Sequence, residues 1–263
     1  LSRGLGDVYK RQTRLSVNLN KVALIRNSRE TNVPSVIDAA KIAINAGAEG
    51  ITVHPRPDMR HIRPQDVYAL SELLADDQYK HIELNIEGNP YAGPEKNGFP
   101  GFIELVQKAS PTQCTLVPDK PTQLTSDHGW DFNINSKTLS PIVRRLHKDN
   151  IRVSLFVDPT EESVEMARAL RSDRVELFTG PYAVSYKSSD QIKVLNAFKS
   201  AAKYAHSLGI GVNAGHDLNL ENLAEFCEAV VPLQEVSIGH AIISDAIWLG
   251  LEETINRYIR ILN

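Results

Sequence analysis

Short apolar segments alternate with longer segments of helical periodicity from Arg14 to the end of the chain, and this alternation limits the possible folds more than any other feature. Helical patterns lie at 64–75, 138–149, 189–208, 219–230 and 241–262, among others. The strand-like segments are RLSVN (14–18), GITVH (50–54), HIELNIE (81–87), QCTLVP (113–118), IRVSLFV (151–157), VELF (175–178), IGVNAG (210–215) and EVSIG (235–239). Strands that alternate with helices are typical of parallel sheets. Eight such units predict an α/β fold, a single-domain (β/α)8 TIM barrel with room for extra short helices.

A doubly wound open sheet is the main alternative to the barrel. Such sheets usually carry a G-x-G-x-x-G turn after an early strand, and this sequence has none. We therefore expect one barrel domain over residues 13–263. The segment LSRGLGDVYKRQ at 1–12 has no clear periodicity, and we expect it to be an unstructured or non-native leader outside the barrel.

Composition excludes several classes of function. The net charge of −3 and a pI near 6.3 provide no general attraction for nucleic acid or membrane surfaces. No apolar run approaches the roughly 20 residues that cross a bilayer, and no signal peptide is visible. The two cysteines, Cys114 and Cys227, are far apart and lack metal-ligand spacing. These features predict a cytoplasmic protein with reduced thiols, without nucleic-acid or membrane partners.

Polar residues gather where the predicted strands end, and in a TIM barrel the active site forms there. Asn18 and Asn20 alternate at the end of the first strand, followed by Lys21, Arg26 and Arg29. This basic segment is either part of an anion site or a solvated loop.

The second predicted strand ends in VHPRPDMRH, which brings His54, Arg56 and His61 to the same region. Histidine titrates closest to neutral pH, which suits proton transfer. Arginine offers a planar fork that matches phosphate or carboxylate oxygens. The combination favours a site for an acidic substrate.

Two carboxylates face the barrel interior in the predicted strands. Glu83 shares a face with Asn85 on the third strand, and Glu176 lies on the sixth. An inward carboxylate needs a partner or acquires a raised pKa, and the latter suits acid-base catalysis. A buried structural ion pair remains the alternative for each.

The loops after the last two strands contain Gly215-His216-Asp217 and Gly239-His240. Phosphate commonly binds there in TIM barrels, at helix N-terminal amides. Metal catalysis is not indicated, because the His-x-His of barrel metallohydrolases is replaced by Asn18-x-Asn20 and no H-E-x-x-H occurs. We therefore expect no catalytic metal. A G-x-S-x-G elbow is also absent.

Seven segments together resemble the pyridoxine 5′-phosphate synthase family, in order and with compatible spacing from residue 14 to 262. They are VNLNKVALIRNSR, EGITVHPRPDMRHI, LVPDKPTQLTSDHGWD, RVSLFVD, ELFTGPYA, VNAGHDLNLENL and IGHAIISDAI. The resemblance implies a transferase-class, ring-closing condensation of 1-deoxy-D-xylulose 5-phosphate with 3-amino-2-oxopropyl phosphate. The products are pyridoxine 5′-phosphate, inorganic phosphate and water. It also implies a homo-oligomer, an octamer, and a reaction that requires neither an organic cofactor nor a metal.

The resemblance further implies roles for individual residues. His54 matches a proton acceptor, Glu83 a second acid-base residue and His216 a proton donor. A water-excluding lid is expected near 122–129. The positions implied for substrate contacts are Asn18, Asn20, Lys21, Arg29, Arg56, His61, Thr125, Asp217, Gly239 and His240.

This chain departs from the common family pattern in three places. Asn20-Lys21 stands where the family has Asp-His, and Asp217 stands where it often has Gly. A carboxylate of Asp217 facing phosphate would weaken binding. The breaker-rich segment 88–101 is longer than in the common form and is expected to lack regular structure.

Two other functions remain open on the residues. A phosphate-binding aldolase or isomerase often needs a Schiff-base lysine inside a strand, and the second to eighth predicted strands carry none. The second open function is a catalytically silent barrel that binds phosphorylated metabolites. The presence of His54, Glu83 and His216 argues against it.

Overall fold

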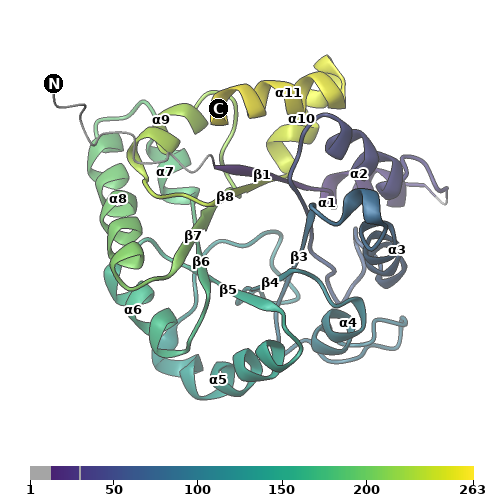
Figure 1. The fold of residues 1–263 in the computed structure, drawn as a ribbon, viewed down its shortest axis with the longest axis horizontal. Helices are drawn as coiled ribbons and strands as arrows, with labels where there is room; N and C mark the ends of the chain where they lie inside the picture. The colour runs from purple at the N-terminus through teal and green to yellow at the C-terminus, as the bar shows by residue number, and fades with distance from the viewer. Residues whose placement is uncertain (1–12, 30) are drawn as a thin grey trace, which may run out of the picture.

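Each strand pairs in parallel with the next along the chain, and the last returns to the first, which closes the sheet into a barrel (Figure 1). The computed structural model describes residues 13–29 and 31–263, so the prediction for residues 1–12 lies outside the described residues. Within them the predicted α/β barrel is confirmed. The strands are β1 (Arg14–Asn18), β2 (Gly50–Val53), β3 (Glu83–Gly88), β4 (Gln113–Leu116), β5 (Arg152–Val157), β6 (Arg174–Leu177), β7 (Gly211–Ala214) and β8 (Glu235–Ile238).

Helices surround the barrel on its outer side (Figure 1). In the described residues none of them is long and apolar enough to cross a membrane. They are α1 (Asn20–Asn27), α2 (Val36–Asn45), α3 (Pro64–Leu74), α4 (Phe102–Ala109), α5 (Phe132–Lys148), α6 (Glu161–Ala169), α7 (Gly180–Ser185), α8 (Gln191–Ser207), α9 (Leu223–Ala229), α10 (His240–Leu249) and α11 (Leu251–Leu262), with a 3₁₀ turn η1 (Asp77–Tyr79).

Two helical regions differ from the sequence-based prediction. Residues 20–27 form α1 rather than a basic loop, because Val22 and Ala23 bury one side of a short helix against the barrel. The single helix predicted over 241–262 is two helices, α10 and α11. They are separated at Gly250, whose φ of +81° a helix cannot contain.

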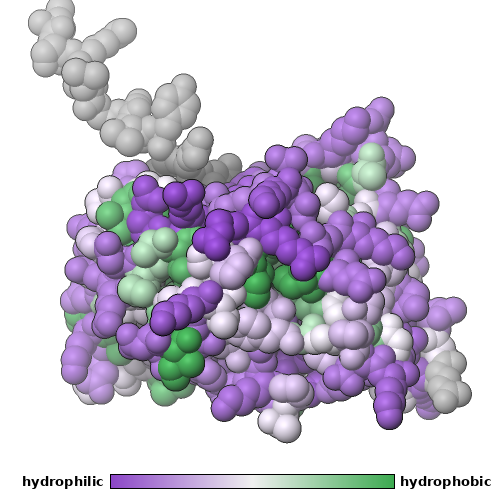
Figure 2. Space-filling view, turned by 90° about the horizontal axis from the view of Figure 1, so that it is seen from below, coloured by the Kyte–Doolittle hydropathy of each residue, from purple (hydrophilic) through white to green (hydrophobic). Residues whose placement is uncertain are grey.

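The hydrophobic core lies between the barrel and the helices. Outward strand residues such as Val17, Ile51 and Leu155 are fully buried against apolar faces of the helices. Several helix starts are fixed by side-chain caps, for example Ser35 before α2 and Thr160 before α6. The face of the molecule shown in Figure 2 is mostly hydrophilic, with hydrophobic side chains in smaller patches.

The bore of the barrel, in contrast, is lined with polar side chains. Gln113 on β4 donates to Glu235 on β8 across the bore at 3.5 Å. Thr52 hydrogen-bonds to Ser16 at 2.7 Å and accepts from Asn85 at 3.4 Å. Branched aliphatic residues usually fill this space in TIM barrels. Here a polar column connects the two ends of the bore.

The segment 89–101 runs along the mouth of the barrel without regular helix or strand, as predicted, apart from an isolated bridge between Pro94 and Pro100. Gly88, the first residue of the predicted segment 88–101, is instead the last residue of β3. Asn89 Nδ2 donates to the Asp119 carbonyl at 2.8 Å, and Asn97 Nδ2 donates to the Pro57 carbonyl at 2.8 Å. The segment therefore supports the loops that follow β2 and β4.

Candidate active site

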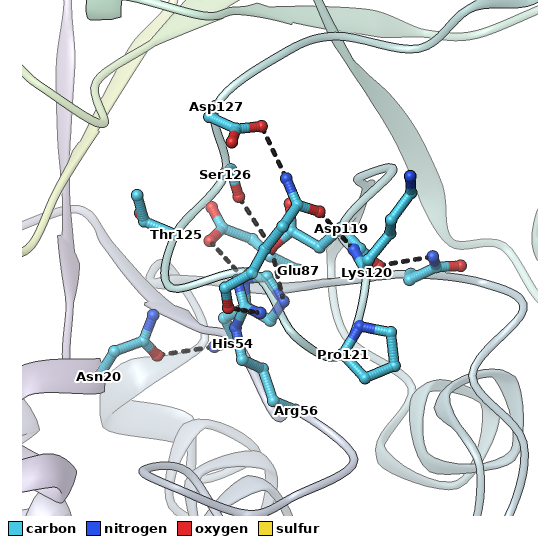
Figure 3. A network of polar contacts seen from close by, with 12 residues as sticks. Asn20, His54, Arg56, Glu87, Asp119, Lys120, Pro121, Thr125, Ser126 and Asp127 are labelled. Atoms are coloured by element: carbon cyan, nitrogen blue, oxygen red, sulfur yellow. Dashed lines mark hydrogen bonds and ion pairs between the residues drawn. The ribbon is translucent and has the colours of Figure 1, made fainter.

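His54 lies directly after β2 and is buried at the mouth of the barrel. Its Nδ1 is 4.0 Å from Glu87 Oε2, and its Nε2 is 3.9 Å from Asp119 Oδ2. The Asn20 side chain accepts a hydrogen bond from the His54 backbone at 2.8 Å (Figure 3). Burial, followed by the positive charge of Arg56, lowers the pKa of His54 well below its ordinary value. The ring is therefore neutral at physiological pH, between two carboxyl groups.

The structure does not bring Glu83 to this site, and that prediction is corrected. Glu83 is the first residue of β3 and pairs with Gly50, four residues before His54, a distance of about 13 Å along the strand. At this amino end of the bore it accepts from Arg14 at 2.6 Å and forms a second ion pair with Arg152. Burial opposes ionisation of Glu83, but Arg152 and Arg14 hold its pKa below the ordinary value. Glu83 therefore forms a structural ion pair, which was the alternative interpretation of this residue from the sequence.

Glu87, at the other end of the same strand, is the carboxyl group that faces His54, and the sequence prediction missed it. It accepts from Asn18 at 3.3 Å and from Asn85 at 3.4 Å. Burial and the nearby charges of Glu176 and Asp119 raise its pKa well above the ordinary value. The period-two pattern Glu83, Asn85, Glu87 in HIELNIE carried the signal, since strand ends at the carboxyl side form the mouth.

Asp119 is the second residue that the prediction missed. It follows β4 in LVPDKP, forms an ion pair with Arg56, and accepts from Ser126 at 3.0 Å (Figure 3). Arg56 also donates to the Gln123 carbonyl at 3.1 Å. Burial raises the pKa of Asp119 despite Arg56. A carboxylate directly after a strand of the predicted barrel was the available signal.

Glu176 on β6 faces the same space as Glu87. Its Oε2 is buried and has no hydrogen-bond partner among the described residues. Burial and the charge of Glu235 raise the pKa of Glu176 to about 7. The alternative of a paired structural carboxylate therefore does not apply to Glu176.

His216 follows β7 and is held on both ring nitrogens. Nδ1 is 2.9 Å from Asp217 Oδ2, and Nε2 is 2.7 Å from Thr125 Oγ1. Burial disfavours the charged ring, but the hydrogen bond and charge of Asp217, with smaller contributions from Glu176 and Asp119, raise the pKa of His216 above its ordinary value. His54 and His216 are thus shifted in opposite directions.

Asn18, Gly215 and Gly239 lie where neighbouring strand ends approach each other closely. A Cβ at Gly239 would lie 2.9 Å from the Asn18 Cβ, and one at Gly215 would overlap the Ser237 carbonyl. The Asn18 side chain also accepts from the Asn20 backbone at 3.0 Å. Glycine at 215 lets the end of β7 approach β8, and glycine at 239 lets the end of β8 approach β1.

The remaining predicted contacts occupy the rim. His61 is buried edge-on to His54, at 6.3 Å between ring centres, and its Nδ1 accepts from the Ile62 backbone at 2.9 Å. Burial and Arg56 lower the pKa of His61 to about 3. Lys21 is half-buried. Arg29 lies in the turn after α1 and His240 at the start of α10, and both are exposed, unlike the buried His54 and Arg56.

Within residues 13–29 and 31–263, no three His, Cys, Asp or Glu side chains are arranged to hold a metal ion. The site instead combines His54, whose pKa is lowered, His216, whose pKa is raised, and the buried carboxyl groups of Glu87 and Glu176, whose pKa values are also raised. These groups can accept and donate several protons at one end of the barrel.

Similarity to known proteins extends across the whole barrel. The family model described as pyridoxal phosphate biosynthesis protein PdxJ matches residues 15–263. The chain belongs to the PdxJ family. A pyridoxine 5′-phosphate synthase of Xanthomonas campestris pv. campestris (strain B100) is 50% identical over 250 residues, covering 95% of this chain and 96% of the relative. The pyridoxine 5′-phosphate synthase of Xylella fastidiosa (strain 9a5c) is 48% identical over 252 residues, covering 96% and 95%.

Solved structures of more distant proteins share the fold of this PdxJ family member. Tryptophan synthase of Mycobacterium tuberculosis superposes with a TM-score of 0.62 at 13% identity, covering 96% of this chain and 93% of that one. Phosphoribosyl anthranilate isomerase of Thermotoga maritima gives 0.57 at 15% identity, covering 95% and 98%. At these identities the likeness concerns the barrel alone.

Proposed function

We propose that this chain makes pyridoxine 5′-phosphate by condensing 1-deoxy-D-xylulose 5-phosphate with 3-amino-2-oxopropyl phosphate, releasing inorganic phosphate and water. Relatives of near-equal length carry the name of that synthase. The observation that carries the proposal is the placement of two histidines at one mouth with different partners, since His54 lies between Glu87 and Asp119 whereas His216 contacts Asp217 and Thr125. Burial lowers the pKa of His54, and Asp217 raises the pKa of His216. Imine formation, dehydration and ring closure each move protons, so they need both a base and an acid.

His54 acts as the proton acceptor. Its neutral ring has a free electron pair at physiological pH and lies between the carboxyl groups of Glu87 and Asp119, each about 4 Å from one of its nitrogens. The Asn20 contact fixes the backbone at this point.

Glu87 takes the second acid-base role that was predicted for Glu83. Its raised pKa favours the protonated carboxyl group, which can donate a proton and take it back. Glu176 shares the same buried space and titrates near neutrality, so it buffers the charge beside Glu87.

His216 is the proton donor. Its raised pKa favours the imidazolium, and its Nε2 contacts Thr125, which lies in the segment 122–129 that we expect to close over the substrates. Closure there would exclude water from reactive intermediates.

Two phosphorylated substrates require two anion sites. Arg56, Arg29 and Lys21 supply positive charge along the rim after β1 and β2, where Asn18, Asn20 and His61 also lie, and Thr125 belongs to the loop after β4. Gly239 and His240 begin α10, whose first amides can hold the second phosphate. Arg56 already pairs with Asp119, so binding a phosphate would require it to exchange that partner.

Exposed hydrophobic residues support assembly into the expected homo-octamer. Leu24 and Ile25 on α1 are 40% and 47% exposed, and Ile247 and Trp248 on the adjacent α10 are 68% and 85% exposed. A tryptophan this exposed favours burial against another subunit. Native mass spectrometry gives the subunit number, and a cytoplasmic location is expected for the assembled enzyme.

Incubation of the purified protein with both substrates tests the reaction. We expect pyridoxine 5′-phosphate and one equivalent of inorganic phosphate, detected by mass spectrometry and a phosphate assay. The variant His216→Ala should remain folded and lose at least about a hundredfold in turnover. Substrate binding without product would instead identify a silent metabolite-binding barrel, and cleavage or isomerisation of a single phosphorylated substrate would identify an aldolase or isomerase.

A further inference from the structure

The carboxylate of Asp217 contacts two neighbouring side chains, His216 and Thr179. Its Oδ2 is 2.9 Å from His216 Nδ1 and accepts from Thr179 Oγ1 at 3.3 Å. The same threonine oxygen accepts from the Asp217 backbone N–H at 3.0 Å. Thr179 therefore fixes both the backbone and the side chain of Asp217, and Asp217 in turn contacts the histidine.

We infer that Asp217 is a positioning residue that orients His216 and keeps Nε2 as the atom that exchanges a proton with the substrate. This inference rests on the proposed role of His216 as proton donor. An acceptor on Nδ1 selects the tautomer with the proton on that nitrogen. Nε2 then faces Thr125 on the mouth side of the ring at 2.7 Å.

The rest of the surroundings is consistent with a fixed ring. Phe178 packs edge-on to the imidazole, with ring centres 6.4 Å apart. The Asp217 carbonyl accepts from Asn222 Nδ2 at 3.3 Å, which anchors the loop after β7 from its far side. Rotation of the ring would break the contacts with both Asp217 and Thr125.

Charged groups face His216 from several elements. Asp217 lies beside it, Glu176 reaches it from β6, and Asp119 from the loop after β4, while His54 is the nearby group that can carry positive charge. Among the carboxylates Asp217 is the one in hydrogen-bond contact and has the largest effect in raising the pKa of His216. Glycine, which the family often has here, can supply neither the contact nor the charge.

The test uses the full-length variants Asp217→Asn and Asp217→Gly. The kcat and KM for both substrates are measured from pH 5.5 to 9, and the His216 ring is titrated by NMR in the ligand-free protein, assigned with His216→Gln. We expect the pKa of His216 to fall in both variants. The alkaline limb of kcat should move to lower pH, with kcat at pH 8 reduced at least about tenfold and KM nearly unchanged.

The chain contains a matched control pair. Asp173 at the amino end of β6 contacts His147 Nε2 at 2.8 Å, outside the site. Asp173→Asn should leave the kcat profile and the His216 titration unchanged. Circular dichroism and thermal unfolding confirm that all variants are folded.

The outcomes separate this inference from the proposed function. An unshifted His216 titration in Asp217→Asn would overturn the positioning role whether or not the protein turns over. A rise in KM with unchanged kcat would overturn it in favour of a substrate contact. Failure of the wild-type protein to form product would reject the proposed function, while the titration would still report on the Asp217–His216 contact.

Discussion

The two ends of the barrel bore use the same residue types for different purposes. At the amino end Glu83 is matched by Arg14 and Arg152, and its pKa is low. At the carboxyl end Glu87 receives only long hydrogen bonds from two asparagines, and its pKa is high. Both glutamates lie on β3 and face the bore.

The difference shows that the surrounding charged groups, and not the residue type, decide whether an inward carboxylate forms a structural ion pair or is suited to proton transfer. Arginines complete the charge balance at one end, which stabilises the ionised form. At the other end burial and neighbouring carboxyl groups stabilise the protonated form. A pair of substitutions on one strand can therefore test the assignment of each end.

The largest effect is expected from Glu87→Gln. The amide keeps the shape and the contacts to asparagine but cannot release a proton, so kcat should fall by about 10²–10⁴-fold. Steady-state kinetics with both substrates measures this loss. A kcat within threefold of the wild-type value would remove Glu87 from the acid-base groups.

A smaller effect is expected from Glu176→Gln, and it depends on pH. The folded-state pKa is about 7, above the ordinary 4.5, so the folded state holds a proton that the unfolded chain releases between these values. Wild-type stability therefore falls as pH rises through that window, by about 2–3 kcal/mol between pH 5 and 8.

Urea unfolding at several pH values measures this difference. The Glu176→Gln variant should lack that part of the decline, so its stability relative to wild type rises from pH 5 to 8. Glu221→Gln, which removes an exposed carboxylate paired with Lys187, serves as the control and should show no such trend. Parallel pH curves for wild type and Glu176→Gln would contradict a raised pKa.

The smallest effect is expected from Glu83→Gln, and it should appear in stability. Removing the charge leaves Arg14 and Arg152 without their carboxylate in a partly exposed setting, which should cost about 1–2 kcal/mol of unfolding free energy. Because the pKa of Glu83 is lowered, the loss should be present at neutral pH and disappear as the pH falls below the ordinary value of 4.5.

Chemical denaturation and turnover together decide the Glu83 prediction. Turnover at saturating substrate should stay within about twofold of wild type, since Glu83 lies far from His54. Glu72→Gln on the exposed side of α3 is the matched control for stability. A loss of kcat as large as that of Glu87→Gln would reverse the comparison between the two ends.

The barrel could be predicted because most of its strands and helices have a hydrophobic periodicity that is visible in the local sequence. RLSVN has the alternation that β1 requires, with Leu15 and Val17 outward and Ser16 inward. The short α1 escaped prediction since its basic residues resemble a loop and only a narrow apolar face is buried. The break at Gly250 was missed because the apolar pattern continues on both sides of it.

The candidate site was predicted in part. His54, Arg56 and His216 were expected at strand ends, and the structure places them at the mouth. Glu87 and Asp119 were missed because their importance comes from contacts with His54 and Arg56, which lie at least 33 residues away in sequence. The choice between Glu83 and Glu87 needs the end of the strand at which each one lies, and not only the face.

The sequence by itself therefore determined the alternating strands and helices, the family, and the gathering of histidines and glycines after particular strands. Those properties are local, since they depend on neighbouring residues and their periodicity. Only the tertiary structure decided which carboxyl groups meet the two histidines and that Asp217 faces the His216 ring. Such contacts depend on strand register and loop path, which are set by packing between segments far apart in the chain.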